Sequence, residues 1–143
     1  MAYFENGKYI EHVLLDYSKN KVMESRFESM AKDIWKMLNK YRPDIIYIEE
    51  VYMSGNAQTM KILTRLQGIV YAWAMNNNCE FNTILPSAWR KVLDLNGKKG
   101  EKRKELKQKS IDYVNDIYGI LVTDDESDAI CIGDAVIRKF GDC

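Results

Sequence analysis

The sequence Asp44-Ile45-Ile46-Tyr47-Ile48-Glu49-Glu50-Val51 decides the fold. It is a nearly continuous run of β-branched and aromatic residues, which is typical of a strand covered on both faces. Two carboxylates, Glu49 and Glu50, lie at its C-terminal end. A charged side chain at the end of a buried strand is costly unless it is paired or binds a metal ion. Glu49 is therefore a candidate functional residue.

Upstream of this strand the sequence predicts a hairpin and a helix. Short apolar runs at Ala2-Tyr3-Phe4 and from Lys8 to Tyr17 flank Asn6-Gly7, a pair that favours a tight turn between two strands. Apolar residues then recur at spacings of three and four from Met23 to Leu38, which is the pattern of an amphipathic helix ending before Pro43. We expect that helix to lie against a sheet.

Downstream of the strand the pattern is mostly helical. The expected elements are a helix over residues 60–73, a strand over 80–85, a short helix from Pro86, a helix over 106–117 and a last helix from near Asp125. A strand, a helix and a second strand in that order predict a parallel pair. The sequence thus predicts an α/β fold, and its 143 residues fit a single domain over residues 1–143.

Composition argues against several classes of protein. The longest mainly apolar stretch, Ile69 to Met75, is far shorter than the roughly 20 residues that cross a bilayer. The N-terminus lacks the pattern of a secretory signal, so a cytoplasmic protein with no membrane partner is expected. Cys79, Cys131 and Cys143 are widely spaced and His12 is the one histidine, so neither a disulfide framework nor a zinc site is expected.

A pair of carboxylates, Asp125 and Asp128, is the second candidate for chemistry. A spacing of three places both on one face of a helix, close enough to share a cation. Capping of the helix start is the alternative interpretation of the same residues. Together with Glu49 the pair would make an all-oxygen site suited to Mg²⁺ or Mn²⁺. Such a site fits the hydrolysis of phosphodiester bonds.

Residues 97–109, here called the basic segment, carry most of the clustered positive charge. We interpret its cations as contacts to a DNA backbone, because the cluster begins in a loop where backbone N–H groups also reach phosphates. The candidates are Lys98, Lys99, Lys102, Arg103 and Lys104. The alternative is a solvated helix face on which Glu101 and Glu105 pair with lysines. Tyr52 either stacks on a base or fills the core, and the sequence alone favours the core.

Five sequence features, taken in order and spacing, resemble the RuvC family of Holliday-junction resolvases. They are Ile48-Glu49-Glu50-Val51-Tyr52, Asn56, Leu66-Gln67-Gly68, Gly97 with the basic run after it, and Asp125-Glu126-Ser127-Asp128-Ala129. The likeness covers nearly the entire chain. The Asp-Asp-Glu-Ser-Asp-Ala form is similar to the phage and prophage branch of that family.

The resemblance implies an RNase H-like fold, a mixed sheet flanked by helices. It also implies a homodimer that nicks four-way DNA junctions symmetrically with Mg²⁺. By position, Glu49, Asp125 and Asp128 match three of four metal-binding carboxylates of the family. Tyr52 matches an aromatic residue that stacks on a base at the junction centre. Lys91 and one residue of 102–104 match phosphate-binding lysines.

One family feature has no match here: the first strand, central in the sheet, which ends in an aspartate. Ala2-Tyr3-Phe4-Glu5-Asn6-Gly7 matches the second strand instead. We therefore expect roughly 15 to 20 residues before Met1 in the functional protein, from a strand of typical length plus a turn. The leading hypothesis is a crossover junction endodeoxyribonuclease. The alternatives are an inactive RNase H-like DNA-binding protein and an enzyme acting on RNA or RNA–DNA hybrids.

Overall fold

A computed structural model of the chain describes residues 1–19, 21–51 and 57–140, the side chain of Phe140 excepted. It consists of two compact units, each described here by itself. The terminal unit comprises residues 1–14 and 84–143, and the middle unit comprises residues 15–83. Within the described ranges no helix is both long and apolar enough to span a membrane.

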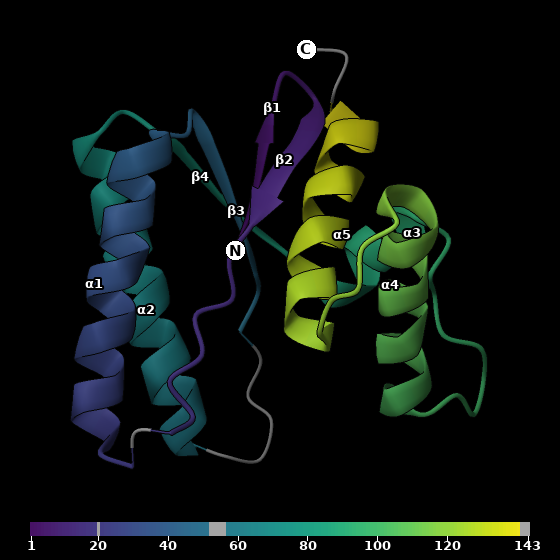
Figure 1. Cartoon of the computed structure of the whole chain (residues 1–143), viewed down its shortest axis with the longest axis horizontal. Helices are drawn as coiled ribbons and strands as arrows, with labels where there is room; N and C mark the ends of the chain where they lie inside the picture. The colour runs from purple at the N-terminus through teal and green to yellow at the C-terminus, as the bar shows by residue number, and fades with distance from the viewer. Residues whose placement is uncertain (20, 52–56, 141–143) are drawn as a thin grey trace. The chain divides into compact units, whose positions relative to one another are not determined.

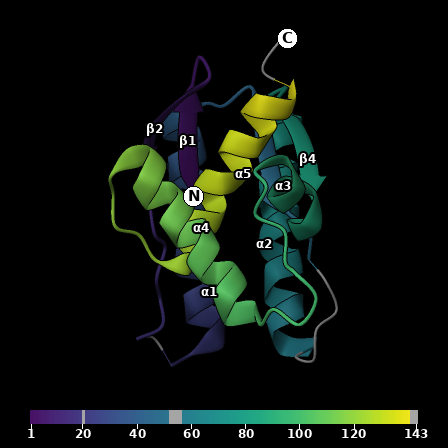
Figure 2. The ribbon, with the colours of Figure 1, turned by 90° about the vertical axis from the view of Figure 1, so that its right-hand side faces the viewer.

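The terminal unit joins a hairpin to three helices. Its elements are β1 (Ala2–Glu5), β2 (Lys8–His12), α3 (Pro86–Val92), α4 (Arg103–Tyr118) and α5 (Asp124–Phe140). Helix α5 is the central element, because the hairpin, α3 and α4 all pack against it (Figure 1). Figure 2 shows the same unit turned by 90°, with α4 crossing in front of α5. Its core includes Trp89, Val114, Ile130 and Cys131, all fully buried.

The Asn-Gly prediction for the hairpin is confirmed. Asn6 and Gly7 both have positive φ, 51° and 71°, as a two-residue turn of the primed type requires. The second strand is shorter than predicted, since β2 ends at His12 and the extended pattern to Tyr17 forms no strand. Its partner β1 has only four residues, so the pairing ends where Val13 N–H bonds to the carbonyl of Met1.

The middle unit packs two helices against two strands. These elements are α1 (Met23–Tyr41), β3 (Ile45–Glu49), α2 (Ala57–Asn76) and β4 (Glu80–Ile84), of which only Ile84 belongs to the terminal unit. The core is built from Leu38, Val70, Trp73 and Ala74, with Ile46, Ile48 and Phe81 packed on it. A hydrogen bond from Glu80 N–H to Asp44 O joins the starts of β3 and β4, as in a parallel pair.

One prediction about burial is wrong. Strand β3 is not covered on both faces: its residues are half-buried at best and Ile45 is 52% exposed. In the part of the chain that the structure describes, β3 pairs only with β4, so no further strand shields it. The central strand that the family resemblance implies stays a prediction.

Candidate active site

The first turn of α5 is closed by a reciprocal pair of hydrogen bonds. The Thr123 backbone N–H and hydroxyl donate to Oε2 of Glu126 at 2.8 and 2.7 Å, and Glu126 N–H points back to the Thr123 hydroxyl at 3.4 Å. This capping box satisfies N–H groups that a helix start leaves free. The Thr123 N–H is the main reason that the pKa of Glu126 lies below its usual range. The turn that carries Asp124 and Asp125 is thereby fixed.

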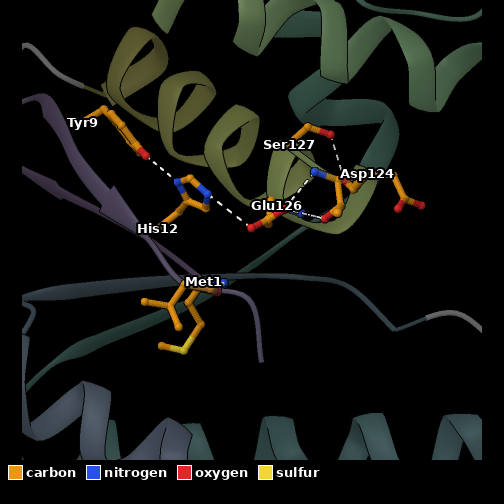
Figure 3. A network of polar contacts seen from close by, with 8 residues as sticks. Met1, Tyr9, His12, Asp124, Glu126 and Ser127 are labelled. Carbon is orange, nitrogen blue, oxygen red and sulfur yellow. Dashed lines mark hydrogen bonds and ion pairs between the residues drawn. The ribbon is translucent and has the colours of Figure 1, made fainter. Parts of the chain in front are cut away.

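The hairpin is bound to this same turn by the Tyr9–His12–Glu126 network (Figure 3). His12, at the end of β2, has Nε2 3.3 Å from Oε1 of Glu126 and Nδ1 2.5 Å from the Tyr9 hydroxyl. The ring of Tyr9 packs in turn on the ring of Tyr118, with centroids 4.7 Å apart. Strand β2 therefore holds the start of α5 and is itself packed on the end of α4.

The two predicted carboxylates of α5 differ in environment. Asp125 is exposed, whereas the side chain of Asp128 is only 22% exposed. Burial raises the pKa of Asp128, against the opposing influence of Ser110 and Arg90. The Ser110 hydroxyl is close, yet it makes no hydrogen bond of ordinary geometry, and Oδ1 of Asp128 has no partner among the described residues. Asp128 thus has an unsatisfied oxygen available for another ligand.

Helices α4 and α5 run in the same direction, because their contacts follow the same order. Lys107 pairs with Asp124 near both starts, and the hydroxyl of Tyr113 donates to Asp134, 3.1 Å away, further along (Figure 1). The pair with Lys107 is also the main cause that lowers the pKa of Asp124. The basic start of α4 therefore lies at the same end of the unit as the acidic start of α5.

The predicted phosphate contacts of the basic segment are all exposed: Lys98, Lys99, Lys102, Arg103 and Lys104. Its glutamates are engaged locally. Glu101 accepts the Lys98 N–H at 2.7 Å and pairs with Lys109, and Glu105 accepts the Lys102 N–H at 2.6 Å. The solvated-face alternative is thus realised in part, by Glu101 and Lys109, while the cations from 98 to 104 still face solvent. Lys91, on α3, is exposed as well and lines a hollow of about 450 Å³ with Val92 and Lys139.

Glu49 and Tyr52 are the remaining predicted site residues. Glu49 ends β3 in the middle unit, whereas Asp125 and Asp128 belong to α5 of the terminal unit. Tyr52 falls outside the described residues. Across residues 1–19, 21–51 and 57–140, no group of three or more His, Cys, Asp or Glu side chains is arranged to hold a metal ion. The predicted three-carboxylate set stays a prediction.

Three residues near the carboxylate pair were missed from the sequence: Arg90, Lys107 and Ser110. Arg90 follows the fully buried Trp89, and a cation beside a core residue is a signal that a paired charge lies nearby. Ser110 lies in the helix predicted over residues 106–117 and is fully buried there, where its hydroxyl needs a partner. Nothing in the sequence indicates that Lys107, rather than its neighbours, pairs with Asp124.

Comparison with known proteins gives one consistent result. A family model described as crossover junction endodeoxyribonuclease RuvC matches residues 5–136. The RuvC of Fusobacterium nucleatum is 23% identical over 140 residues, which are 96% of this chain and 72% of that protein. The RuvC of Brachyspira hyodysenteriae is 24% identical over 126 residues, which are 87% of this chain and 75% of that protein.

Solved structures agree on the fold. The structure of T. thermophilus RuvC in complex with a Holliday junction substrate is similar with a TM-score of 0.59 and 13% identity, covering 92% of this chain and 74% of that one. The Thermus thermophilus RuvC structure gives a TM-score of 0.57 and 15% identity, covering 94% and 77%. At such low identity the likeness shows the fold alone, an α/β fold of the RNase H-like kind.

Proposed function

This chain belongs to the RuvC family of crossover junction endodeoxyribonucleases, and on that basis we propose that it cuts four-way DNA junctions by metal-dependent hydrolysis of phosphodiester bonds. The observation that carries the proposal is the family match over residues 5–136, a range that contains Glu49, Asp125 and Asp128. The inactive DNA-binding alternative is not favoured, because the relatives that match are themselves endodeoxyribonucleases.

RuvC nucleases depend on a metal ion, and the carboxylates of α5 fit one. Asp128 has a buried oxygen without a partner, and Asp125 lies three residues earlier on the same helix. We propose that both bind Mg²⁺ or Mn²⁺ and that Glu49 of the middle unit is the third ligand, since hard cations prefer oxygen donors. When bound, such an ion supplies an activated water and stabilises the leaving oxygen.

The DNA backbone is proposed to lie along the basic segment and Lys91. The cations from Lys98 to Lys104 are exposed and occupy the end of the terminal unit at which α5 begins. Lysine and arginine contacts to phosphates fix the position and orientation of a DNA ligand without reading its sequence. Tyr52 is proposed to stack on an unpaired base, as the family resemblance implies.

The whole of residues 1–143 is proposed to act as one nuclease domain, in a cytoplasmic homodimer. A four-way junction has two opposed strands to cut, and two copies of one chain provide two equivalent sites for symmetric nicks. Each copy then has to supply Glu49, Asp125 and Asp128 to its own site.

The proposal is tested with three labelled substrates, a synthetic four-way junction, a linear duplex of the same sequence and an RNA–DNA hybrid, each with Mg²⁺. We expect nicking of the junction alone. Asp128→Asn should abolish nicking while leaving junction binding in EDTA largely intact, because the substitution removes charge from a half-buried site. If the hybrid is cut in preference to the junction, the substrate of the enzyme is an RNA–DNA hybrid and not a four-way junction. Binding by the wild type without any cutting would favour the inactive DNA-binding alternative.

A further inference from the structure

Three buried polar atoms around Asp128 have no hydrogen-bond partner within the described residues. They are Oδ1 of Asp128 itself, the hydroxyl of Ser110 and Nε of Arg90. The three residues come from three different helices, α5, α4 and α3. Buried polar groups in folded proteins are nearly always paired, so three unpaired atoms around one carboxylate call for a physical reason.

The guanidinium of Arg90 lies close to Asp128 but forms no short hydrogen bond with it. Nη2 lies 3.7 Å from Oδ2 of Asp128, whereas a charge-assisted hydrogen bond is about 2.7–2.9 Å long. The guanidinium carbon also lies 4.4 Å from the centroid of the buried Trp89 ring. Only 17% of the Arg90 side chain is exposed, so solvent does little to satisfy it.

A permanent buried ion pair is stabilising only when its geometry is good and its other donors and acceptors are satisfied. Neither condition holds for Arg90 and Asp128. The pair therefore provides a counter-charge for Asp128 without occupying both of its oxygens. A second cation can then take the carboxylate without first breaking a short hydrogen bond.

We propose that Arg90 is a positioning residue that neutralises and orients Asp128 in the metal-free protein and yields the carboxylate to the divalent cation when it binds. This inference rests on the proposed function, because it assumes that Asp128 is a metal ligand. Arg90 contacts neither substrate nor metal. It acts through Asp128, and Ser110 completes the polar surroundings of the same carboxylate.

The test compares Arg90→Gln with wild type by thermal unfolding in EDTA and by Mg²⁺ titration calorimetry, both without DNA. Without metal, Arg90→Gln should melt several degrees lower, because Asp128 is left half-buried and unpaired. It should also bind Mg²⁺ about fivefold more tightly. Removing one positive charge about 4 Å from the carboxylate makes the binding free energy of a cation there more favourable by roughly 1 kcal/mol even in water. Lys91→Gln, the same charge change at the next residue, should leave the melting temperature near wild type.

The Asp128→Asn background separates this role from simple packing. There, Arg90→Gln should change the melting temperature little, because the charge that Arg90 neutralises is gone. If Arg90→Gln alone does not fold, Asp128→Asn should restore folding. If Arg90→Gln lowers the melting temperature equally in both backgrounds, Arg90 acts by packing on Trp89. If Arg90→Gln binds Mg²⁺ more weakly than wild type, Arg90 is part of the metal-bound site. Either result overturns the proposal. Failure of the wild type to cut junctions would instead overturn the proposed function.

Discussion

Nε2 of His12 lies 3.3 Å from Oε1 of Glu126 and so joins the end of β2 to the first turn of α5 (Figure 3). The two ring nitrogens of His12 serve both contacts at once: Nδ1 lies 2.5 Å from the Tyr9 hydroxyl, and Nε2 faces the carboxylate. Asp125 precedes Glu126 directly. The chain's one histidine therefore helps to hold the turn that carries Asp125, one of the proposed metal ligands.

Removing the imidazole should destabilise the protein more than removing the Tyr9 hydroxyl. His12→Ala leaves Glu126 and Tyr9 each without a half-buried partner, for an expected loss of about 1–3 kcal/mol in the free energy of unfolding. Tyr9→Phe keeps the ring on Tyr118 and should lose about 0.5–1.5 kcal/mol. Urea unfolding at neutral pH measures both values. If His12→Ala were no worse than Tyr9→Phe, the bond to Glu126 would contribute nothing.

Acid should weaken the fold partly through Glu126. Its pKa is lowered in the folded protein, chiefly by the Thr123 N–H, so the stabilisation is complete above the unfolded value of 4.5 and is lost as pH falls through the lower folded value. Glu126→Gln keeps an acceptor for the cap but cannot titrate. Its unfolding free energy, measured from pH 6 downward, should fall less steeply below 4.5 than that of wild type. Parallel curves would exclude Glu126 from the acid response.

Neighbouring aspartates at the start of α5 should separate catalysis from stability. Asp125→Asn removes an exposed proposed metal ligand, so junction nicking at saturating Mg²⁺ should fall by more than about 100-fold, beyond the effect of losing an outer-shell partner. Asp124→Asn removes the partner of Lys107 and should cost about 1 kcal/mol or less, since that pair is a third exposed. Nicking by Asp124→Asn should stay near wild type. Equal nicking losses would mean that the helix start, not the ligand, had been damaged.

The basic segment should determine the salt dependence of junction binding. Lys99→Gln and Arg103→Gln each remove one exposed cation, and each should reduce the slope of log affinity against log salt by about 1 if that residue contacts a phosphate. Fluorescence anisotropy in EDTA at several salt concentrations gives the slope. The control is Lys36→Gln, an exposed lysine of α1 outside the segment, whose slope should match wild type. If all three variants keep the wild-type slope, the basic segment is a solvated surface that does not contact the DNA backbone.

Local patterns predicted the elements, whereas the site depends on contacts that local patterns do not contain. The hairpin turn was predictable because the positive φ values that it requires depend on two adjacent residues alone, Asn6 and Gly7. The neighbours of Asp128 are instead Arg90 and Ser110, on two other helices. Their proximity to Asp128 cannot be predicted from any spacing in the sequence. For the same reason β2 was predicted too long: the strand's own pattern continues past His12, but its partner β1 does not.

Gly133 decides how closely the hairpin approaches α5. A Cβ added there would lie 2.1 Å from Cε2 and 2.6 Å from Cζ of Phe4, so the ring of this β1 residue occupies the space of the missing side chain. The ring has little freedom to move aside, because it forms a T-shaped pair with the ring of Tyr9, with centroids 5.7 Å apart. Gly68 in α2 is the matched case, since a Cβ there meets nothing within 4 Å.

Alanine at these two glycines should therefore change stability in opposite directions. Within a helix alanine is favoured over glycine by about 1 kcal/mol, so Gly68→Ala should raise the free energy of unfolding by up to that amount. At Gly133 the steric conflict with Phe4 outweighs the helix preference, and Gly133→Ala should lower it by about 1–3 kcal/mol. Phe4→Ala removes the conflict, so in that background Gly133→Ala should become neutral or stabilising. Urea unfolding of the four variants measures the reversal, and a loss at Gly133 that persists without the Phe4 ring would show that another contact limits the approach.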